Sequence, residues 1–449
     1  MQNKYYLVVG LGLTGLSIAR YLIRKKEPFM VFDTREKPAG AAEFKYDFPG
    51  VDLFLGELPD SVYDELKGII CSPGVPVESP VIQKGIEKQI PILGDVDCLA
   101  QEIDAPIVAI TGTNGKSTVT TLVGEMTKAS GLNTAVAGNI GLPVLDILDV
   151  GVQYDMWVLE LSSFQLDLTH QLKPAVSTIL NISPDHLDRH HDFQSYIDSK
   201  HKIYQNAKCV VYNRDDKSTF PTDDDGPYQK MSSFGSNVDS GKGWGFVVEQ
   251  DRTWLAKAGE AIFPVDELRI RGRHNWMNAL AACALADAVG IKKNHMIEVL
   301  KRFGGLPHRS QWVKTLNQVD WVNDSKATNV GATISAITGI GGSMQGKIVL
   351  IAGGKGKGAA FEELTQPMSD YVRSVVLIGE DADLIEQVIP EHVETIQAIS
   401  MDDAVAKANA TACPGDVVLL SPACASFDMF RDFNHRGDDF MAAVDGLVQ

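Results

Sequence analysis

The chain has 449 residues, too many for a single hydrophobic core, and a domain size of about 150 residues indicates three domains. Its formal net charge of −17 argues against a broad basic surface for nucleic acid, so phosphorylated ligands must be held by local glycine loops and a few cations. The six cysteines show no Cys-x-x-Cys pairing, as expected for the reduced thiols of a cytoplasmic enzyme. Glycines interrupt the apolar run near the N-terminus, and we expect neither a signal peptide nor a membrane-spanning segment.

Residues 1–94 form a first block in which apolar strands alternate with helical patterns, as in parallel α/β domains. The expected strands are 6–9, 29–32 and 68–71, and a helix is expected at 16–25.

A glycine-rich turn follows the first of these strands. Gly10, Gly12 and Gly15 have the Gly-x-Gly-x-x-Gly spacing of a dinucleotide fingerprint, and Asp33 ends the next strand. Taken alone, this pattern suggests an NAD-dependent oxidoreductase; a turn used only for helix packing is the other interpretation. Arg35 places a cation just past the strand, which suits another anionic group better than a bare ribose.

The second block, 95–305, begins with a buried strand at 106–110 that leads into Gly112-Thr-Asn-Gly-Lys-Ser117. This is a P-loop pattern, although Ile110 occupies the place of its first glycine. The glycines let backbone N–H groups approach phosphates, Lys116 can reach the β and γ oxygens, and the Ser117 hydroxyl can bind Mg²⁺. A glycine turn before a helix capped by Ser or Thr is the structural alternative.

Polar residues follow two further strands of this block, expected at 157–159 and 177–180. Glu160 ends the first, where a carboxylate can bind the nucleotide's Mg²⁺; a helix-start role is the alternative. After the second, residues 181–191 concentrate acids and histidines, which suggests metal or proton chemistry. From this cluster we select His186, and we expect His190 and His191 to be exposed.

Lys200 lies in a helix expected at 193–206. A rotation of about 100° per residue places it on the apolar face, while Lys202 points the opposite way. A buried lysine must be neutralised, paired or modified, whereas a side chain whose head reaches water needs none of these.

The remaining segments complete the organisation. A fourth strand is expected at 209–212, a surface loop or hairpin turns at 220–245, a helix at 275–289 and a hinge at 303–307. In the third block, 306–449, the strands expected at 348–351 and 375–378 precede glycines, and a strand expected at 417–420 precedes Ser421. Ligands in such sheets gather outside the carboxyl ends of the strands.

Eight motifs occur in a single order along the chain. The first four are Gly112-Thr-Asn-Gly-Lys-Ser117, Glu160-Leu-Ser-Ser-Phe-Gln165, Asn181-x-x-x-Asp185-His186-Leu-Asp188 and Ser195-Tyr-x-x-x-Lys200. The others are Pro307-His308-Arg309, Asn323-Asp324-Ser-Lys326-Ala-Thr328-Asn329, Ala352-Gly-Gly-x-x-Lys357-Gly and Leu419-Leu-Ser-Pro-Ala-Cys-Ala-Ser426-Phe-Asp428. Together they resemble the Mur ligase family over nearly the whole chain. The Asp-Asn-Pro-Arg signature of its diaminopimelate-adding members is absent.

The resemblance implies an α/β fold of three domains: a Rossmann-like, UDP-substrate-binding domain at 1–94, a central P-loop ATP-binding domain with a mostly parallel sheet at 95–305, and a Rossmann-like, amino-acid-binding domain at 306–449. It also implies an ATP-dependent acid–amino-acid ligase of peptidoglycan biosynthesis, which adds D-glutamate to UDP-N-acetylmuramoyl-L-alanine through an acyl phosphate. Such an enzyme takes part in cell-wall biogenesis, cell shape and cell division. We expect a cytoplasmic monomer.

By the same resemblance, the catalytic residues would be Lys116, Glu160, His186, Lys200 and Lys326. ATP would contact Gly112, Thr113, Asn114, Gly115, Lys116, Ser117, Thr118, Asn275, Asn278, Arg309 and Asp324. Two Mg²⁺ ions would be held by Ser117, Glu160, His186 and a carbamylated Lys200. The substrates would contact Leu13, Thr14, Thr34, Arg35, Ser72 and Gly74 through the UDP group, Asn139, Gln165 and His186 through the muramyl peptide, and Thr328, Lys357, Ser426, Phe427 and Phe433 through D-glutamate.

Three alternatives are left open. A folylpolyglutamate-type or other Mur ligase would use the same acyl phosphate with another acceptor. An NAD-binding oxidoreductase would explain the first block and leave the P-loop without a role. A non-catalytic nucleotide-binding module would give Glu160, His186 and Lys200 no purpose.

Overall fold

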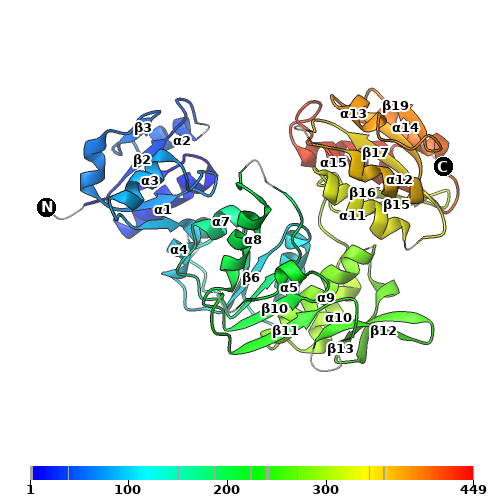
Figure 1. Ribbon diagram of the computed structural model, residues 1–449, viewed down its shortest axis with the longest axis horizontal. Coiled ribbons are helices and arrows are strands. Elements are labelled where there is room, and N and C mark those ends of the chain that lie inside the picture. The colour runs from blue at the N-terminus through cyan, green and yellow to red at the C-terminus, as the bar shows by residue number, and fades with distance from the viewer. Residues whose placement is uncertain are drawn as a thin grey trace. The chain divides into compact units, whose positions relative to one another are not determined.

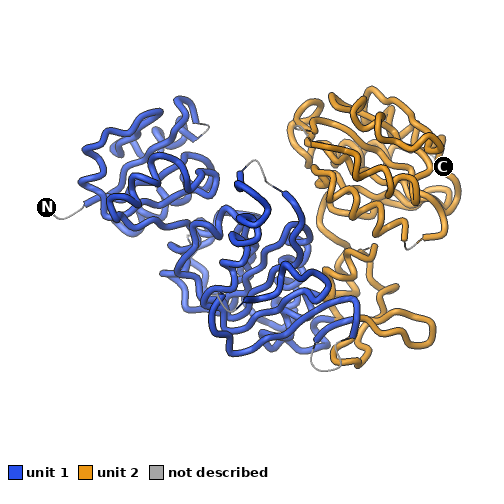
Figure 2. The backbone as a smooth tube through the Cα atoms, in the orientation of Figure 1, with its two compact units in different colours: residues 1–245, 281–296 blue, residues 246–280, 297–449 orange. Residues whose placement is uncertain are grey.

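The computed structural model describes residues 4–38, 40–148, 151–185, 189–222, 225–238, 243–270, 272–342, 344–356 and 359–447. The chain divides into two compact units, one of residues 1–245 and 281–296, the other of residues 246–280 and 297–449 (Figure 2). The first unit contains an N-terminal and a central sheet, and a third sheet lies in the second unit (Figure 1). Among the described residues, no helix is long and apolar enough to cross a membrane.

The N-terminal sheet has five parallel strands in the order β3-β2-β1-β4-β5. Alternate residues of its middle strand serve two cores, because Val8 packs into one cluster while Leu7 and Val9 pack into another. The sheet is therefore covered on both faces, as in a Rossmann-like domain. Its elements are β1 (Tyr5–Val9), α1 (Leu13–Lys25), β2 (Phe29–Asp33), α2 (Ala41–Asp47), β3 (Leu53–Leu55), β4 (Leu66–Cys71), α3 (Pro80–Glu87) and β5 (Ile92–Gly94).

Within the first compact unit, the central sheet includes a run of parallel strands in the order β11-β10-β9-β6-β8-β7. Strand β6 pairs with β8 on one side and β9 on the other, so the carboxyl ends of all three meet at one edge. The elements up to β10 are α4 (Asp95–Ala100), β6 (Ile107–Thr111), α5 (Lys116–Ala129), β7 (Thr134–Gly138), α6 (Val144–Leu148), β8 (Met156–Glu160), α7 (Ser163–Asp167), β9 (Val176–Ile179), α8 (Phe193–His201) and β10 (Cys209–Asn213). They are followed by β11 (Lys230–Phe234), β12 (Trp244–Glu249), the antiparallel pair β13 (Arg252–Lys257) and β14 (Glu260–Pro264), α9 (Arg273–Ala288) and α10 (Lys293–Arg302).

The C-terminal sheet has six strands in the order β15-β16-β20-β17-β18-β19, of which only β15 is antiparallel to its neighbour. Its middle strand again feeds two cores, with Leu350 on one side and Val349 and Ile351 on the other. The elements are β15 (Gln311–Leu316), β16 (Val319–Asn323), α11 (Val330–Gly341), β17 (Ile348–Gly353), α12 (Thr365–Tyr371), β18 (Val372–Ile378), α13 (Ala382–Glu386), β19 (Glu394–Gln397), α14 (Met401–Thr411), β20 (Val417–Leu420) and α15 (Phe433–Asp445).

The expected α/β class, with three domains and mostly parallel sheets, is confirmed, and each strand predicted from an apolar run is present. One prediction is wrong. Within 220–245, expected to be a loop, β11 forms a parallel strand whose five residues pair with β10. The strand has only two buried residues, Ser233 and Phe234, so its sequence lacks the apolar run of its neighbours.

Candidate active site

A cavity of about 520 Å³ lies at the carboxyl ends of the N-terminal strands. Gly12 borders it, and a Cβ at this position would meet nothing within 4 Å. Gly15 instead allows close packing of the backbone, because a Cβ there would lie 1.9 Å from the Gly10 carbonyl oxygen. The lining includes all six residues predicted to contact a UDP group: Leu13, Thr14, Thr34, Arg35, Ser72 and Gly74.

Asp33 is buried at the edge of this cavity. Its carboxylate accepts hydrogen bonds from the Leu11 N–H at 2.7 Å and from the Arg35 backbone N–H and Nε, both at 2.9 Å, and Arg35 Nη2 donates at 2.7 Å. Burial raises the pKa of Asp33, but these hydrogen bonds outweigh it and hold the pKa below its usual range. Because protein donors already occupy the carboxylate, Asp33 is poorly suited to accept the ribose hydroxyls of NAD.

The P-loop connects β6 to α5. Gly112 has a φ of 152°, and a Cβ there would lie 3.0 Å from the Leu180 Cβ atom, so glycine fits this position. The helix begins at Lys116 after Gly115, which has a φ of 82°. Lys116 Nζ donates to the carbonyl oxygens of Gly112 at 2.9 Å and Thr113 at 2.8 Å, which keeps its positive charge over the loop.

Asn181, which follows β9, holds the P-loop at two points. Its Oδ1 accepts from the Asn114 N–H at 2.8 Å, and its Nδ2 donates to the Asn114 carbonyl oxygen at 3.0 Å. Its own carbonyl oxygen accepts from the Thr113 N–H at 2.8 Å. In the sequence, Asn181 is marked only by its place at the head of a motif, which does not indicate these contacts.

Glu160 ends β8 and is 1 % exposed. Asn139 Nδ2 donates to its Oε1 at 3.0 Å, whereas its buried Oε2 has no hydrogen-bond partner among the described residues. A buried carboxylate oxygen without a donor fits a cation. The helix-start interpretation is wrong, because Ser162 caps α7 in a capping box with Gln165.

Lys200 is also 1 % exposed, so the interpretation in which its head reaches water is wrong. Its Nζ donates to the Gly112 carbonyl oxygen at 2.9 Å and lies 4.6 Å from the centre of the Tyr196 ring. Burial, and secondarily the positive charge of Lys116, lower the pKa of Lys200 well below its usual range. Burial therefore favours the neutral form of an amine that contacts the P-loop backbone.

The histidine-rich segment is only partly as expected. His191 is exposed, but the prediction that His190 is exposed is wrong. His190 is buried because its Nε2 lies 3.0 Å from Ser163 Oγ and its ring stacks on Phe164. His186 lies outside the described residues. Within them, no group of three or more His, Cys, Asp or Glu could hold a metal ion.

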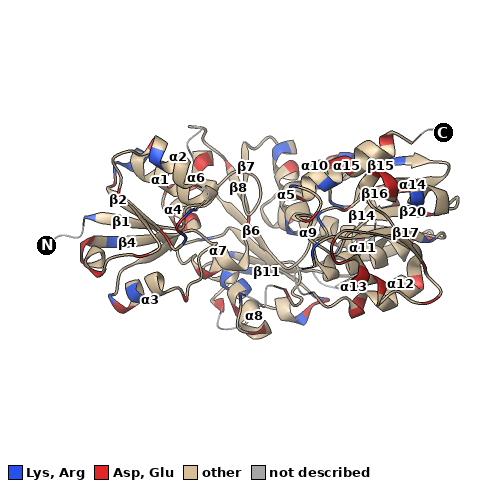
Figure 3. Cartoon of the chain, turned by 90° about the horizontal axis from the view of Figure 1, so that it is seen from above, with Lys and Arg blue, Asp and Glu red and all other residues tan. Residues whose placement is uncertain are grey.

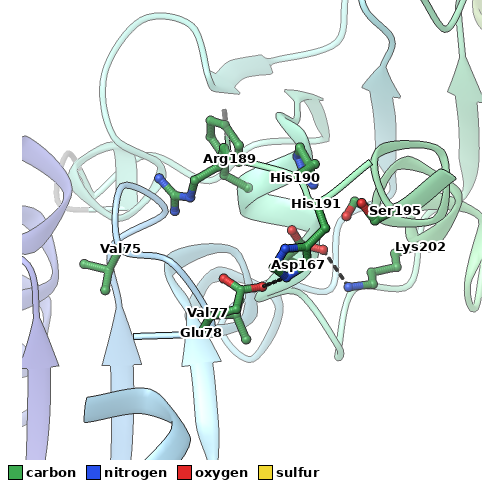
Figure 4. Close-up of a pocket in the computed structure, with 11 residues that line it drawn as sticks. Val75, Val77, Glu78, Asp167, Arg189, His190, His191, Ser195 and Lys202 are labelled. Carbon is green, nitrogen blue, oxygen red and sulfur yellow. Dashed lines mark hydrogen bonds and ion pairs between the residues drawn. The ribbon is translucent and has the colours of Figure 1, made fainter. Parts of the chain in front are cut away.

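Figure 4 shows a second cavity, of about 160 Å³, between the 75–78 segment and helices α7 and α8. Arg189 borders it, and its guanidinium donates to the carbonyl oxygens of Gly74 at 3.0 Å and Pro73 at 3.2 Å. The same guanidinium lies 4.6 Å from the centre of the Phe164 ring. Arg189 thus connects the turn of the first cavity to the central domain.

The residues predicted for the adenine and ribose side of ATP belong to the second compact unit. In α9, Asn278 Nδ2 donates to Asn275 Oδ1 at 3.1 Å. Asp324 follows β16 and accepts from the Ser310 N–H at 2.9 Å and from Ser421 Oγ at 3.1 Å. Burial raises the pKa of Asp324 to about 6 against these hydrogen bonds. Arg309, the fourth predicted contact, belongs to the same unit.

The predicted D-glutamate residues follow β16, β17 and β20 of the C-terminal sheet. Lys326 Nζ lies 3.9 Å from the centre of the Phe433 ring, and the Thr328 N–H donates to the Lys326 carbonyl oxygen at 2.8 Å. Ser426 is buried, and its Oγ has no hydrogen-bond partner in the described part of the chain, while Phe427 is 65 % exposed. Lys357 lies outside the described residues.

Family models match three successive parts of the chain. These are the Mur ligase MurD-like N-terminal domain at residues 4–94, the Mur ligase middle domain at 110–286 and the Mur ligase glutamate ligase domain at 308–424. The chain belongs to the Mur ligase family.

Particular relatives match the whole chain. The UDP-N-acetylmuramoylalanine–D-glutamate ligase of Legionella pneumophila (strain Paris) is 58 % identical over 447 residues, and the alignment covers 100 % of both chains. The ligase of the same name from Pseudomonas aeruginosa is 46 % identical over 446 residues, with 99 % of both chains covered.

Solved structures show the same fold at low identity. A pseudomurein peptide ligase type C from Methanothermus fervidus has a TM-score of 0.59 at 21 % identity, over 99 % of this chain and 100 % of that one. The UDP-N-acetylmuramate-alanine ligase of Thermotoga maritima has a TM-score of 0.58 at 18 % identity, over 98 % and 99 % of the two chains.

The contacts of Asn181 predict that Asn181→Ala weakens nucleotide binding about tenfold, because two hydrogen bonds that fix Asn114 are lost. Calorimetric titration with ATP measures this. Asn213→Ala is the matched control, since Asn213 Nδ2 donates to the neighbouring Leu180 carbonyl oxygen at 2.8 Å without contacting the loop. Unchanged affinity in Asn181→Ala, or an equal loss in both variants, would contradict the assignment.

Proposed function

We propose that the protein is an ATP-dependent ligase that adds D-glutamate to UDP-N-acetylmuramoyl-L-alanine in peptidoglycan biosynthesis. The observation that carries the proposal is the identity of 58 % and 46 %, over essentially the whole length, with relatives that bear this activity in their names. An NAD-dependent oxidoreductase is disfavoured because four donors already occupy the Asp33 carboxylate.

Each of the three domains binds a different substrate or part of a substrate. The first, at 1–94, binds the UDP group in the 520 Å³ cavity, where Arg35 supplies the cation for a diphosphate. The second, at 95–305, binds the phosphates of ATP at the P-loop, and Asn139, Gln165 and His186 line the path of the muramyl peptide. The third, at 306–449, binds D-glutamate through Thr328, Lys357, Ser426, Phe427 and Phe433. The adenine and ribose side of ATP contacts Asn275, Asn278, Arg309 and Asp324.

The reaction has two steps. The acceptor carboxylate attacks the γ-phosphate of ATP, which gives an acyl phosphate and ADP; the amino group of D-glutamate then displaces phosphate through a tetrahedral intermediate. The first step joins two anions, so it requires charge neutralisation and alignment. Lys116 neutralises the phosphates over the P-loop, and Lys326 stabilises the acyl phosphate.

The residues beneath the P-loop fit divalent cations. Glu160 offers a buried oxygen without a hydrogen-bond donor among the described residues, and Ser117 offers a hydroxyl at the start of α5. Burial favours the neutral form of the Lys200 amine, and that form can capture CO₂ with loss of a proton to give an anionic carbamate. Ser117, Glu160, His186 and the carbamylated Lys200 would hold two Mg²⁺ ions. When bound, Mg²⁺ neutralises charge on the phosphoryl oxygens.

We further propose that the protein is a monomer in the cytoplasm and does not insert into membranes.

An amino-acid panel tests the function. Phosphate release from ATP should require both UDP-N-acetylmuramoyl-L-alanine and D-glutamate, because the acyl phosphate turns over only when the amine displaces phosphate. L-Glutamate and other L-amino acids should not replace D-glutamate. Equal phosphate release without any amino acid would contradict ligation.

Replacing Lys200 tests the carbamate. Lys200→Ala should lower turnover by about 10²-fold or more, because an anionic ligand beneath the phosphates is lost. A small added carboxylate should restore part of the activity. Lys202→Ala is the matched control, since Lys202 points away and pairs with Asp167 at 2.6 Å. Full activity in Lys200→Ala would exclude the carbamate.

A further inference from the structure

Arg436, near the start of α15, is a fully buried cation whose hydrogen-bond acceptors among the described residues are all uncharged. Its Nε donates to Ser325 Oγ at 3.0 Å, and its Nη2 donates to the Ser325 carbonyl oxygen at 2.8 Å. Both Nη atoms donate to the Cys424 carbonyl oxygen at 3.1 Å. In the described part of the chain, no carboxylate lies within ion-pair distance of this guanidinium.

An arrangement of this kind is costly. Burial lowers the pKa of Arg436 to about 10, which shows how strongly its surroundings disfavour the charge. A buried cation without an ionic partner is a weak source of stability. Its distinctive contribution is geometric, because the planar guanidinium presents donors in a rigid fork that can hold two backbone segments at once.

The two segments that Arg436 joins carry the predicted D-glutamate residues. Ser325 follows β16 three residues before Thr328, and Cys424 follows β20 two residues before Ser426. Ser325 Oγ also donates to the Phe433 carbonyl oxygen at 2.8 Å, so one hydroxyl contacts both the guanidinium and the start of α15.

The connection extends to the segment after β17. The backbone N–H groups of Lys355 and Ala425 each donate to the other's carbonyl oxygen at 2.9 Å. The segment that leads to Lys357 is thereby tied to the one that Arg436 holds. No room remains between them, since a Cβ at Gly354 would lie 2.3 Å from the Ala425 carbonyl oxygen and 3.3 Å from Arg436 Nη1.

We propose that Arg436 is a positioning residue for the amino-acid substrate, which sets the spacing of the segments after β16, β17 and β20 without touching D-glutamate itself. This inference rests on the proposed function. Binding a dicarboxylate requires donors from several loops at fixed separations, and a shift of about 1 Å is enough to weaken binding.

Replacing Arg436 with lysine keeps the charge and removes the fork. For Arg436→Lys, we expect the KM for D-glutamate to rise about tenfold, with the KM values for ATP and the UDP-linked acceptor within about twofold of wild type. Ser325→Ala is the second variant. It leaves the cation in place and removes the hydroxyl that contacts Arg436 and Phe433, so the KM for D-glutamate should rise in the same selective way.

Arg373→Lys is the matched control. Arg373 makes an equivalent two-point contact in the same domain, with Nε 2.7 Å and Nη2 3.1 Å from the carboxylate oxygens of Asp416. Asp416 precedes β20, so this contact lies at the opposite edge of the sheet from the predicted D-glutamate residues. Arg373→Lys should lower the melting temperature and leave the KM for D-glutamate unchanged.

Two results would overturn the proposal. One is an unchanged KM for D-glutamate in Ser325→Ala and in any folded Arg436→Lys protein. The other is an equal rise in all three KM values, or the same rise in Arg373→Lys, which would indicate a general structural role. Failure of the wild-type protein to ligate D-glutamate would instead refute the proposed function.

Discussion

The parallel pairing of β6 with β8 and β9 is the constraint on which the rest of the site depends. Its register pairs Ile110 with Glu160 and Thr111 with Ile179, so the P-loop, a buried carboxylate and the Asn181 segment begin at one edge. Lys200 reaches the same edge from α8 and donates to the Gly112 carbonyl oxygen. The pairing therefore brings two lysine amines, a carboxylate oxygen and a fixed loop together at one edge of the sheet, where burial makes electrostatic interactions strong.

The distribution of charged side chains over the protein is consistent with this arrangement. The chain carries a net charge of −17, and Figure 3 shows Lys and Arg interspersed with Asp and Glu on the helices. In the proposed function, anionic ligands would instead be met by a few cations at defined positions, namely Arg35 in the N-terminal cavity, Lys116 at the P-loop and Lys326 after β16. Each lies just beyond the carboxyl end of a strand. The Asp33 carboxylate orients Arg35, backbone carbonyl oxygens orient Lys116, and the Phe433 ring lies against Lys326.

Local sequence patterns predicted most of the fold and the main parts of the site. Parallel strands that are buried on both faces have continuous apolar sequences, which makes them recognisable. The glycines of the turns after β1 and β6 mark where the backbone must bend or approach a ligand. Lys200 was placed correctly because helical periodicity depends only on nearby residues. Strand β11 was missed because its pairing with β10, and not its own composition, makes it a strand.

The remaining errors and omissions concern contacts between distant segments. His190 was predicted to be exposed because it lies in a polar run, but it is buried by packing on Ser163, Phe164 and Tyr196. Asn181 acts on a loop 67 residues away, and Arg436 acts on Ser325 at a separation of 111 residues. No local pattern encodes such a contact, so the residues that position the ligand-binding groups emerge only from the folded chain.

The most direct test of the central claim, that the P-loop transfers phosphate to the acceptor's carboxylate, follows an oxygen atom. The acceptor would be labelled with ¹⁸O in that carboxylate and turned over with ATP and D-glutamate, and the released phosphate analysed by mass spectrometry. An acyl phosphate predicts that a carboxylate oxygen of each acceptor molecule passes into the phosphate. Phosphate free of label, with amide product formed, would contradict the account.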